Sequence, residues 1–311
     1  MKHISNIRDL KIMYITTSIA VQSFEYGELF NLDNTFKYKN DRMQYFIQSN
    51  LKIYNLFISN WGSISDFKYS LYLHYFLKLN EFIYDKFDDK QKIIKKNDIG
   101  KFIIDEFNEN TAQILYGKGD KNKYYSLIFL AIPFALKIHN KNKLISSLHV
   151  FLKEIIDEEE HILATITCSL FINYAINGVK IEDWIENINK DLKELSSENY
   201  LDQLNNYYEL NFRNNIFVEQ KIEDLVDVRN KNFFDNYCNK NNRILSENPA
   251  EQVLLIYDTL IRSRYKWDKL ILFGMVNYND NISISIILGC LYEILFSSTK
   301  INKNLIKRFS F

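Results

Sequence analysis

The chain has 311 residues, 47% of them hydrophobic, and its 39 Lys and Arg residues balance its 39 Asp and Glu residues. This hydrophobic content excludes a disordered chain, and the balanced charge provides no overall field that would attract nucleic acid or a membrane. Only eight glycines and two prolines are present, which argues against sandwiches and barrels because these need many turn residues. We therefore predict an all-α fold in one domain that covers residues 1–311.

Cysteine usage and apolar runs indicate the compartment. The sequence contains three cysteines, Cys168, Cys238 and Cys290. Their odd number and wide spacing predict neither a disulfide framework nor a zinc site, and we expect a cytoplasmic protein. The apolar stretch Ile12–Val21 mimics a weak signal sequence, but Asp9 precedes it and no cleavage pattern follows it, so a buried helix is favoured. The longest apolar runs, Tyr124–Ile138 and Ile282–Phe296, are shorter than the ~20 residues that cross a bilayer.

Most of the chain shows apolar residues at the three- and four-residue spacing of a helix. In chain order, the predicted helices cover Asp9–Phe24, Asn40–Asn60, Ser65–Phe87, Ile99–Leu115, Tyr124–His139, Lys143–Ile156, His161–Asn177, Asp183–Leu195, Ala250–Ser263, Lys266–Met275 and Ile282–Phe296. We expect Pro133 to break the fifth of these helices and Gly178 to cap the seventh. The polar segment Ser197–Asn242 has the weakest pattern, and we expect two or three short helices and a mobile loop there.

The last predicted helix, Ile282–Phe296, is apolar on every face, which indicates the most buried helix of the chain. The polar turn Asn277–Asn281 comes directly before it, and Asn and Asp are good N-cap residues. Asp280 is thereby placed at a helix N-terminus, whose partial positive charge favours anions. Gly289 within the helix would allow close packing of a neighbour.

These residues resemble the C-terminal signature of the ADP-ribosylglycohydrolase family, of the dinitrogenase-reductase-activating glycohydrolase type. The segment Val276–Asp280 matches the first part of that signature, and Gly289 matches its glycine. Ile282 stands at the position of the second aspartate of the family, and Ser283 stands at the position of its threonine. Both glycines of the family loop are missing. The spacing of the signature is therefore kept, while much of its chemistry is lost.

Two N-terminal blocks resemble the same family in the same order. Ile15–Glu25 is similar to the first conserved block and keeps its glutamate as Glu25. Lys39–Met43 stands where the family has a Thr-Asp-Asp motif and keeps one aspartate, Asp41.

Further matches lie in the middle and the C-terminal third of the chain. Tyr124–Phe134 resembles the segment that wraps ADP-ribose, with Pro133 kept and Leu130 at the position of an arginine. The Thr-His motif of the family falls at Ile155–Glu159, where no histidine is present. The segment Ala250–Asn277, which includes Asp258, resembles the helix pair before the last signature.

The resemblance implies a compact multi-helix domain, with Glu25 as the catalytic residue and two magnesium ions held by carboxylates from both ends of the chain. Only Asp41 and Asp280 remain as metal ligands. We therefore expect no tightly bound cofactor and at most one weakly held magnesium ion.

The function that follows is a non-catalytic relative that acts by binding. Its partner would be a protein, either an ADP-ribosylating toxin that it neutralises as an immunity protein or an ADP-ribosylated target. An alternative is a residual hydrolase that removes ADP-ribose from protein or nucleic acid with an altered magnesium site. A purely structural role is the third possibility.

Plainer roles also fit the same residues. Glu25 could be an ordinary carboxylate at a helix end, while Asp41 and Asp280 could be N-caps. The acidic run Asp157–Glu160 precedes a predicted helix and is typical of a solvated first turn. The five histidines have no ligand spacing, and we expect all of them to be structural.

Overall fold

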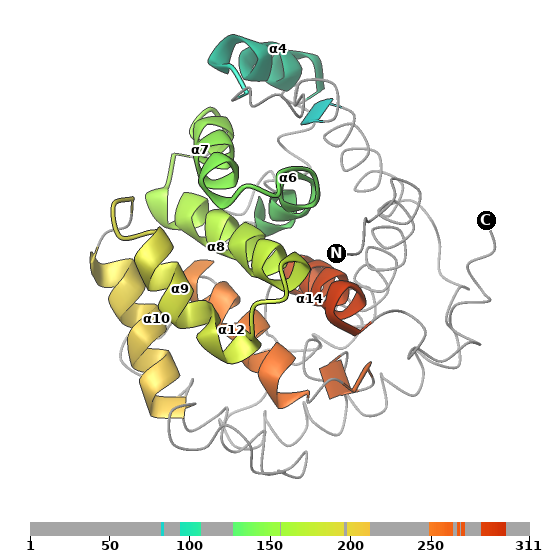
Figure 1. Cartoon of the computed structure of the whole chain (residues 1–311). Helices are drawn as coiled ribbons and strands as arrows, with labels where there is room; N and C mark the ends of the chain where they lie inside the picture. Colours follow the sequence, from blue (N-terminus) through green and yellow to red (C-terminus); the bar gives the residue numbers. More distant parts are fainter. Residues whose placement is uncertain are drawn as a thin grey trace, which may run out of the picture.

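The computed structural model describes residues 82–83, 94–106, 127–155, 157–195, 198–211, 249–263, 266–267, 269–270 and 281–296. Every secondary-structure element within these ranges is a helix (Figure 1), which confirms the all-α prediction for this part of the chain. The elements are α4 (Lys96–Glu106), the 3₁₀ helix η1 (Leu127–Leu130), α6 (Ala131–Lys137), α7 (Lys141–Leu152), α8 (Glu159–Ile176), the 3₁₀ helix η2 (Ile181–Asp183), α9 (Trp184–Asp191), α10 (Glu198–Asn211), α12 (Pro249–Arg262) and α14 (Asn281–Phe296). None of the helices among these residues is long and apolar enough to cross a membrane.

Helix α8 lies at the centre of the described residues. It packs against α6, α7, α12 and α14 (Figure 1), and every residue from Ile162 to Ala175 is buried. Helix α14 begins one residue before the predicted start and ends at the predicted Phe296, and its last three residues, Ile294–Phe296, are only half-buried. The side chains of Ile282, Ser283, Ser285 and Ile286 lie outside the description, so our expectation that Ile282–Phe296 is the most buried helix stays a prediction.

The segment before α7 shows how proline is placed. We had expected Pro133 to break a helix. In the structure it is instead the third residue of α6. In the first turn of a helix its missing N–H would have no intrahelical acceptor, so proline is tolerated there. The change of helix type occurs earlier, between η1 and α6. Asn140 caps α7 by accepting a hydrogen bond from the Lys143 amide at 3.1 Å.

The C-terminus of α8 is closed by Gly178, as the sequence predicted. Gly178 has φ +71°, a conformation that side-chain-bearing residues rarely adopt. Its amide donates to the carbonyl of Ala175 at 3.2 Å, and the Val179 amide donates to the carbonyl of Tyr174 at 3.0 Å. This pair of bonds is a Schellman motif and satisfies two carbonyls that the helix leaves without partners.

Helix α10 is longer and more regular than we expected for Ser197–Asn242. Its 14 residues bury Tyr200 and Leu204, which are four residues apart on one side of the helix. The polar composition of this segment concealed that periodicity. The remainder of the segment, residues 212–242, lies outside the described residues.

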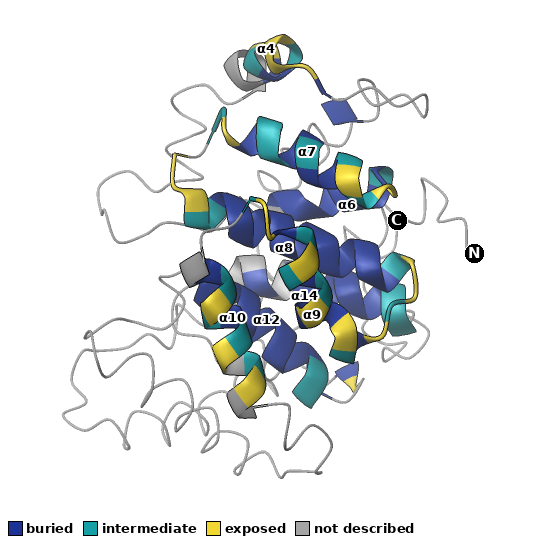
Figure 2. Cartoon of the chain, turned by 60° about the vertical axis from the view of Figure 1, so that its left-hand side comes forward, coloured by how far each residue is buried: buried dark blue, intermediate teal, exposed yellow. Residues whose placement is uncertain are grey.

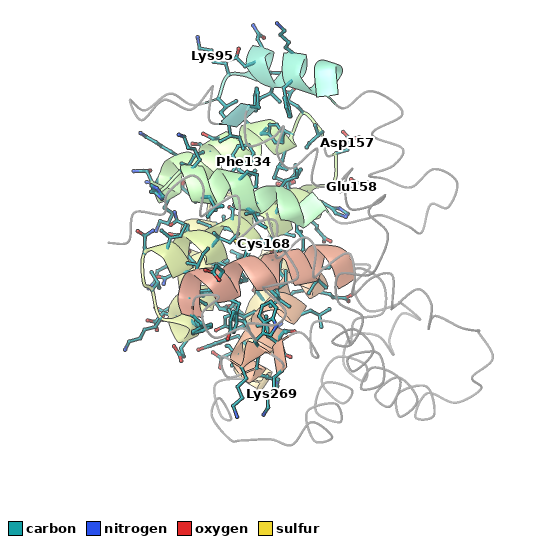
Figure 3. All side chains as sticks on the ribbon, turned by 90° about the vertical axis from the view of Figure 1, so that its right-hand side faces the viewer. Lys95, Phe134, Asp157, Glu158, Cys168 and Lys269 are labelled. Carbon is teal, nitrogen blue, oxygen red and sulfur yellow. The ribbon has the colours of Figure 1, made fainter. Side chains whose placement is uncertain are left out.

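Aromatic side chains join the central helix to its neighbours. Phe171 of α8 stacks on Trp184 of α9 at 5.2 Å and lies 5.8 Å from Tyr257 of α12, as measured between ring centroids. Phe134 of α6 lies in the same interior (Figure 3). Removal of a buried aromatic side chain typically costs about 3–5 kcal/mol, so these contacts are a main source of stability. Figure 2 shows that the exposed residues collect on the outer sides of α7, α9 and α10.

Candidate functional site

The three residues predicted to carry chemistry, Glu25, Asp41 and Asp280, lie outside the described residues. Helix α14 begins at Asn281, directly after Asp280, so the helix start agrees with the sequence prediction. The backbone of Ile282 and Ser283 belongs to α14, while their side chains are outside the description. The predicted magnesium ligands and the predicted catalytic glutamate therefore remain predictions.

The segment that resembles the ADP-ribose wrap is described from η1 onward. Helix η1 packs against both α8 and α14, so this segment lies beside the helix that follows Asp280. Leu130 is 1% exposed and Ile128 is fully buried. At the position that the resemblance aligns with an arginine, the chain thus has an aliphatic side chain enclosed in the core. Such a side chain offers no hydrogen-bond donor to a phosphate.

Asp258, another position of the resemblance, is a fully buried carboxylate on α12. It accepts a hydrogen bond from Nε of Arg262 at 2.6 Å, one turn later on the same helix. Arg262 is itself only 12% exposed, so the buried negative charge is balanced by an adjacent positive charge. The pair connects two successive turns of α12.

A second polar cluster joins the ends of three helices. Asp191 at the end of α9 accepts hydrogen bonds from Tyr174 Oη at 2.5 Å and from Lys141 Nζ at 2.6 Å. Burial raises the pKa of Tyr174, and the hydrogen bond to Asp191 raises it further. Tyr174 is therefore a hydrogen-bond donor at neutral pH and no candidate for a general base. The cluster ties α7, α8 and α9 together.

The N-terminal end of α8 carries the acidic run. Asp157, Glu158 and Glu159 are exposed, as the sequence predicted for a solvated first turn (Figure 3). Beside them, His161 has a buried Nδ1 atom that makes no hydrogen bond with any described residue. Burial lowers the pKa of His161, and the charges of Glu158 and Glu160 oppose this effect in part. The imidazole is consequently neutral near pH 7.

No group of three or more His, Cys, Asp or Glu side chains in the described ranges is arranged to hold a metal ion. Cys168 and Cys290 are buried and are not joined by a disulfide, and burial raises the pKa of the Cys168 thiol. A buried thiol of this kind is a poor nucleophile, because the reactive form is the thiolate. Cys238 lies outside the described residues.

The Asp191 cluster was missed by sequence reasoning, although a signal for it exists. On a helical wheel, Asp191 lies on the same side of α9 as Trp184 and Ile188, both fully buried. A carboxylate on the apolar side of an amphipathic helix indicates a buried partner. That partner, Lys141, lies 50 residues away in the sequence, so a local pattern could not identify it.

The comparisons with known proteins leave the family open. The chain matches no model of a known protein family, and no curated protein is significantly similar to it.

Proposed function

We propose that this protein is a degenerate relative of the ADP-ribosylglycohydrolases that acts by binding and without efficient catalysis. Its partner is a protein, for which we favour an ADP-ribosylating toxin that it neutralises or a target that carries ADP-ribose. The proposal rests on the order of the resembling segments, and the arrangement of η1, α8 and α14 as neighbours is compatible with it.

The observation that carries the proposal is the burial of Leu130. A pyrophosphate needs donors and close approach of the backbone. Leu130 is 1% exposed and gives neither a charge nor a donor at the position of the family's arginine. A protein without this contact lacks a donor that would orient the pyrophosphate of ADP-ribose.

The metal site supports the same conclusion through its ligands. Magnesium requires several oxygen ligands in near-octahedral geometry. Ile282 replaces one expected aspartate, so Asp41 and Asp280 are the remaining carboxylates at the matched positions. Two carboxylates hold at most one hydrated ion weakly, which is insufficient for a two-metal mechanism.

Calorimetric titration with ADP-ribose, with and without magnesium, tests the proposal. We expect no magnesium-dependent tight binding, and we expect the double variant Asp41→Ala, Asp280→Ala to give the same titration as the wild type. A residual hydrolase would instead show magnesium-dependent binding that the double variant loses. That result, together with release of ADP-ribose from a modified substrate, would replace our proposal by the hydrolase alternative.

A further inference from the structure

The turn that ends α8 contains a chemically reactive pair of residues. Asn177 is followed by Gly178, and this is the only Asn-Gly pair in the 311-residue sequence. Both residues are exposed. Glycine has no Cβ atom to shield its amide nitrogen, so this nitrogen can reach the side-chain carbonyl carbon of the asparagine before it. The pair is therefore a place where the chain can react with itself.

The turn requires only one member of this pair. Gly178 has φ +71°, so the helix cap needs a glycine there. Asn177 has φ −84° and ψ 1°, a turn conformation that most residue types adopt. Its backbone amide donates to the carbonyl of Asn173 at 3.0 Å. This carbonyl therefore has a partner without any help from the Asn177 side chain.

Three hydrogen bonds restrain the reacting groups in the folded chain. Nδ2 of Asn177 donates to the backbone carbonyl of Asn173 at 2.9 Å and to its Oδ1 at 3.1 Å. The Gly178 amide donates to the carbonyl of Ala175 at 3.2 Å, the long end of the usual range. The side-chain amide must leave Asn173, and the Gly178 amide must leave Ala175, before they react. Such local opening is easiest at exposed helix ends.

We propose that Asn177–Gly178 is a self-modification site, at which the chain converts Asn177 to aspartate and isoaspartate with water as the only co-reactant. The hydrogen bonds to Asn173 act as the gate, because they hold the side-chain amide away from the Gly178 nitrogen. This inference is independent of the function proposed above.

The reaction balances without an oxidant or a reductant. The Gly178 nitrogen loses its proton and attacks Cγ of Asn177, which forms an N–Cγ bond and closes a succinimide ring. The Cγ–Nδ2 bond breaks, and Nδ2 leaves as ammonia after it gains a proton. Water then opens the ring at either carbonyl. Attack at Cγ gives aspartate at position 177, whereas attack at the backbone carbonyl gives isoaspartate, in which the chain runs through Cγ.

The products weaken the end of α8. A carboxylate cannot donate to Asn173, and its charge lies at the negative end of the helix dipole. Asn173 also donates to the carbonyl of His139 at 3.0 Å, and the next residue, Tyr174, donates to Asp191. The reaction therefore takes place beside the polar contacts that join α8 to the start of α7 and to α9. The modified protein is less stable than the fresh one, and the change is irreversible.

Peptide mapping by mass spectrometry tests this site in the full folded chain, incubated at mildly alkaline pH in water enriched in heavy oxygen. We expect aspartate and isoaspartate at position 177, each with an oxygen atom from the water, at a rate that rises with pH. Asn140, which is also exposed and precedes Lys141, is the internal control and should stay unmodified. The variant Asn177→Gln should form no such product, because its longer side chain would have to close a larger ring.

Two variants of Asn173 test the gate. Asn173→Ala removes the side-chain acceptor of the Asn177 amide and should speed the reaction in the folded chain by about two- to tenfold, the range that corresponds to one hydrogen bond. Asn173→Asp loses the amide donor to His139 but keeps an acceptor for Asn177, so the rate should change little. In urea, the wild type and both variants should react at one common rate, faster than the folded wild type.

Three outcomes would overturn the proposal: no modification at position 177 of the folded chain, formation of aspartate without isoaspartate, and an equally fast reaction at Asn140. Equal rates in Asn173→Ala and Asn173→Asp would show that general stability controls the reaction, which overturns the gate. The modified protein is then separated by ion exchange and should unfold at a lower temperature than the unmodified protein. An unchanged unfolding temperature would contradict the weakening of α8.

Discussion

The two ends of α8 are held in opposite ways. At the C-terminal end, Gly178 closes the helix, Asn173 donates to the carbonyl of His139 at 3.0 Å, and Tyr174 donates to Asp191. At the N-terminal end, the N-cap residue Glu158 makes no capping hydrogen bond through its side chain, and His161 keeps a buried nitrogen without a partner among the described residues.

This difference indicates that polar contacts at the C-terminal end of α8 stabilise the fold more than those at its N-terminal end. The C-terminal end satisfies its polar groups through contacts with α6, α7 and α9. The N-terminal end has exposed carboxylates at Asp157–Glu159 and an unsatisfied polar atom. It also adjoins Ile155–Glu159, where the resemblance places the family's Thr-His motif. Unsatisfied polar groups are expected at functional sites more often than at purely structural ones.

The largest effect should come from Phe171, which anchors the C-terminal half of α8 to α9 and α12. We expect Phe171→Ala to lower the free energy of unfolding by about 3–5 kcal/mol, through lost burial and the cavity left behind. Urea denaturation measures this change. Phe171→Leu serves as the control and should lose clearly less, because it keeps most of the volume. Equal losses would mean that aromatic stacking, and not volume, determines this contact.

The next effect concerns the Asp191 cluster. Asp191→Ala leaves Tyr174 Oη without its buried acceptor and Lys141 without its ion pair. Hydrogen bonds to charged groups contribute about 1.5–3 kcal/mol, and we expect about 2 kcal/mol here because Lys141 is 41% exposed. Glu186→Ala removes an exposed i,i+4 pair with Lys190 on the same helix and should have no measurable effect. If the two variants lost comparable free energy of unfolding, the Asp191 cluster would contribute no more than an exposed ion pair.

A smaller effect is expected at Gly178. Its positive φ makes any side chain strained, so Gly178→Ala should destabilise the protein by about 1–2 kcal/mol. Gly100, within α4, has no positive φ, and a methyl group added there would meet open space. Gly100→Ala should therefore stabilise the protein slightly, by up to about 1 kcal/mol. The opposite signs can be read from thermal unfolding, and a shared sign would contradict the assigned role of Gly178.

The smallest effect is a pH dependence at the N-terminal end of α8. Burial holds the pKa of His161 below its usual range, so the unfolded chain binds a proton more readily than the folded one. Stability should then fall as the pH drops through about 6.5 and continue to fall until the folded pKa is reached.

The variant His161→Gln should weaken this decline. His149, whose pKa burial also lowers, should contribute to the same decline, and the double variant should show the weakest slope. Unfolding curves between pH 7 and 5 measure it. An unchanged slope in His161→Gln would show that the buried nitrogen finds a partner in solution.

Sequence reasoning succeeded where a signal is local. The bounds of α8, α12 and α14 agree within two residues with those predicted from apolar periodicity and from Pro249 and Gly178. For Ser197–Asn242 it predicted short helices but not the bounds or the 14-residue length of α10, because a polar composition concealed the spacing of Tyr200 and Leu204.

Contacts between distant segments were beyond local patterns. The choice of α8 as the central helix depends on how many helices pack around it, and both α8 and α14 are apolar on all sides. The bond between Lys141 and Asp191 is equally non-local. At the candidate site, the sequence predicted a helix start after Asp280, which the structure has at Asn281. The roles of Glu25, Asp41 and Asp280 remain predictions.

The central claim is that this protein binds without efficient catalysis. Removal of one group that stabilises developing charge typically costs about 10²–10³ in rate, and several such groups are absent at the positions that the proposed resemblance matches. The direct test compares the wild type with the triple variant Glu25→Ala, Asp41→Ala, Asp280→Ala.

Two quantities are measured for both proteins: release of ADP-ribose from ADP-ribosyl-arginine, -serine and -nucleobase substrates, and protection of cells against an ADP-ribosylating toxin. We predict that the wild type releases no more ADP-ribose than the triple variant and that both protect equally. If a correctly folded triple variant loses both protection and measurable ADP-ribose release, the site is catalytic and the account is contradicted.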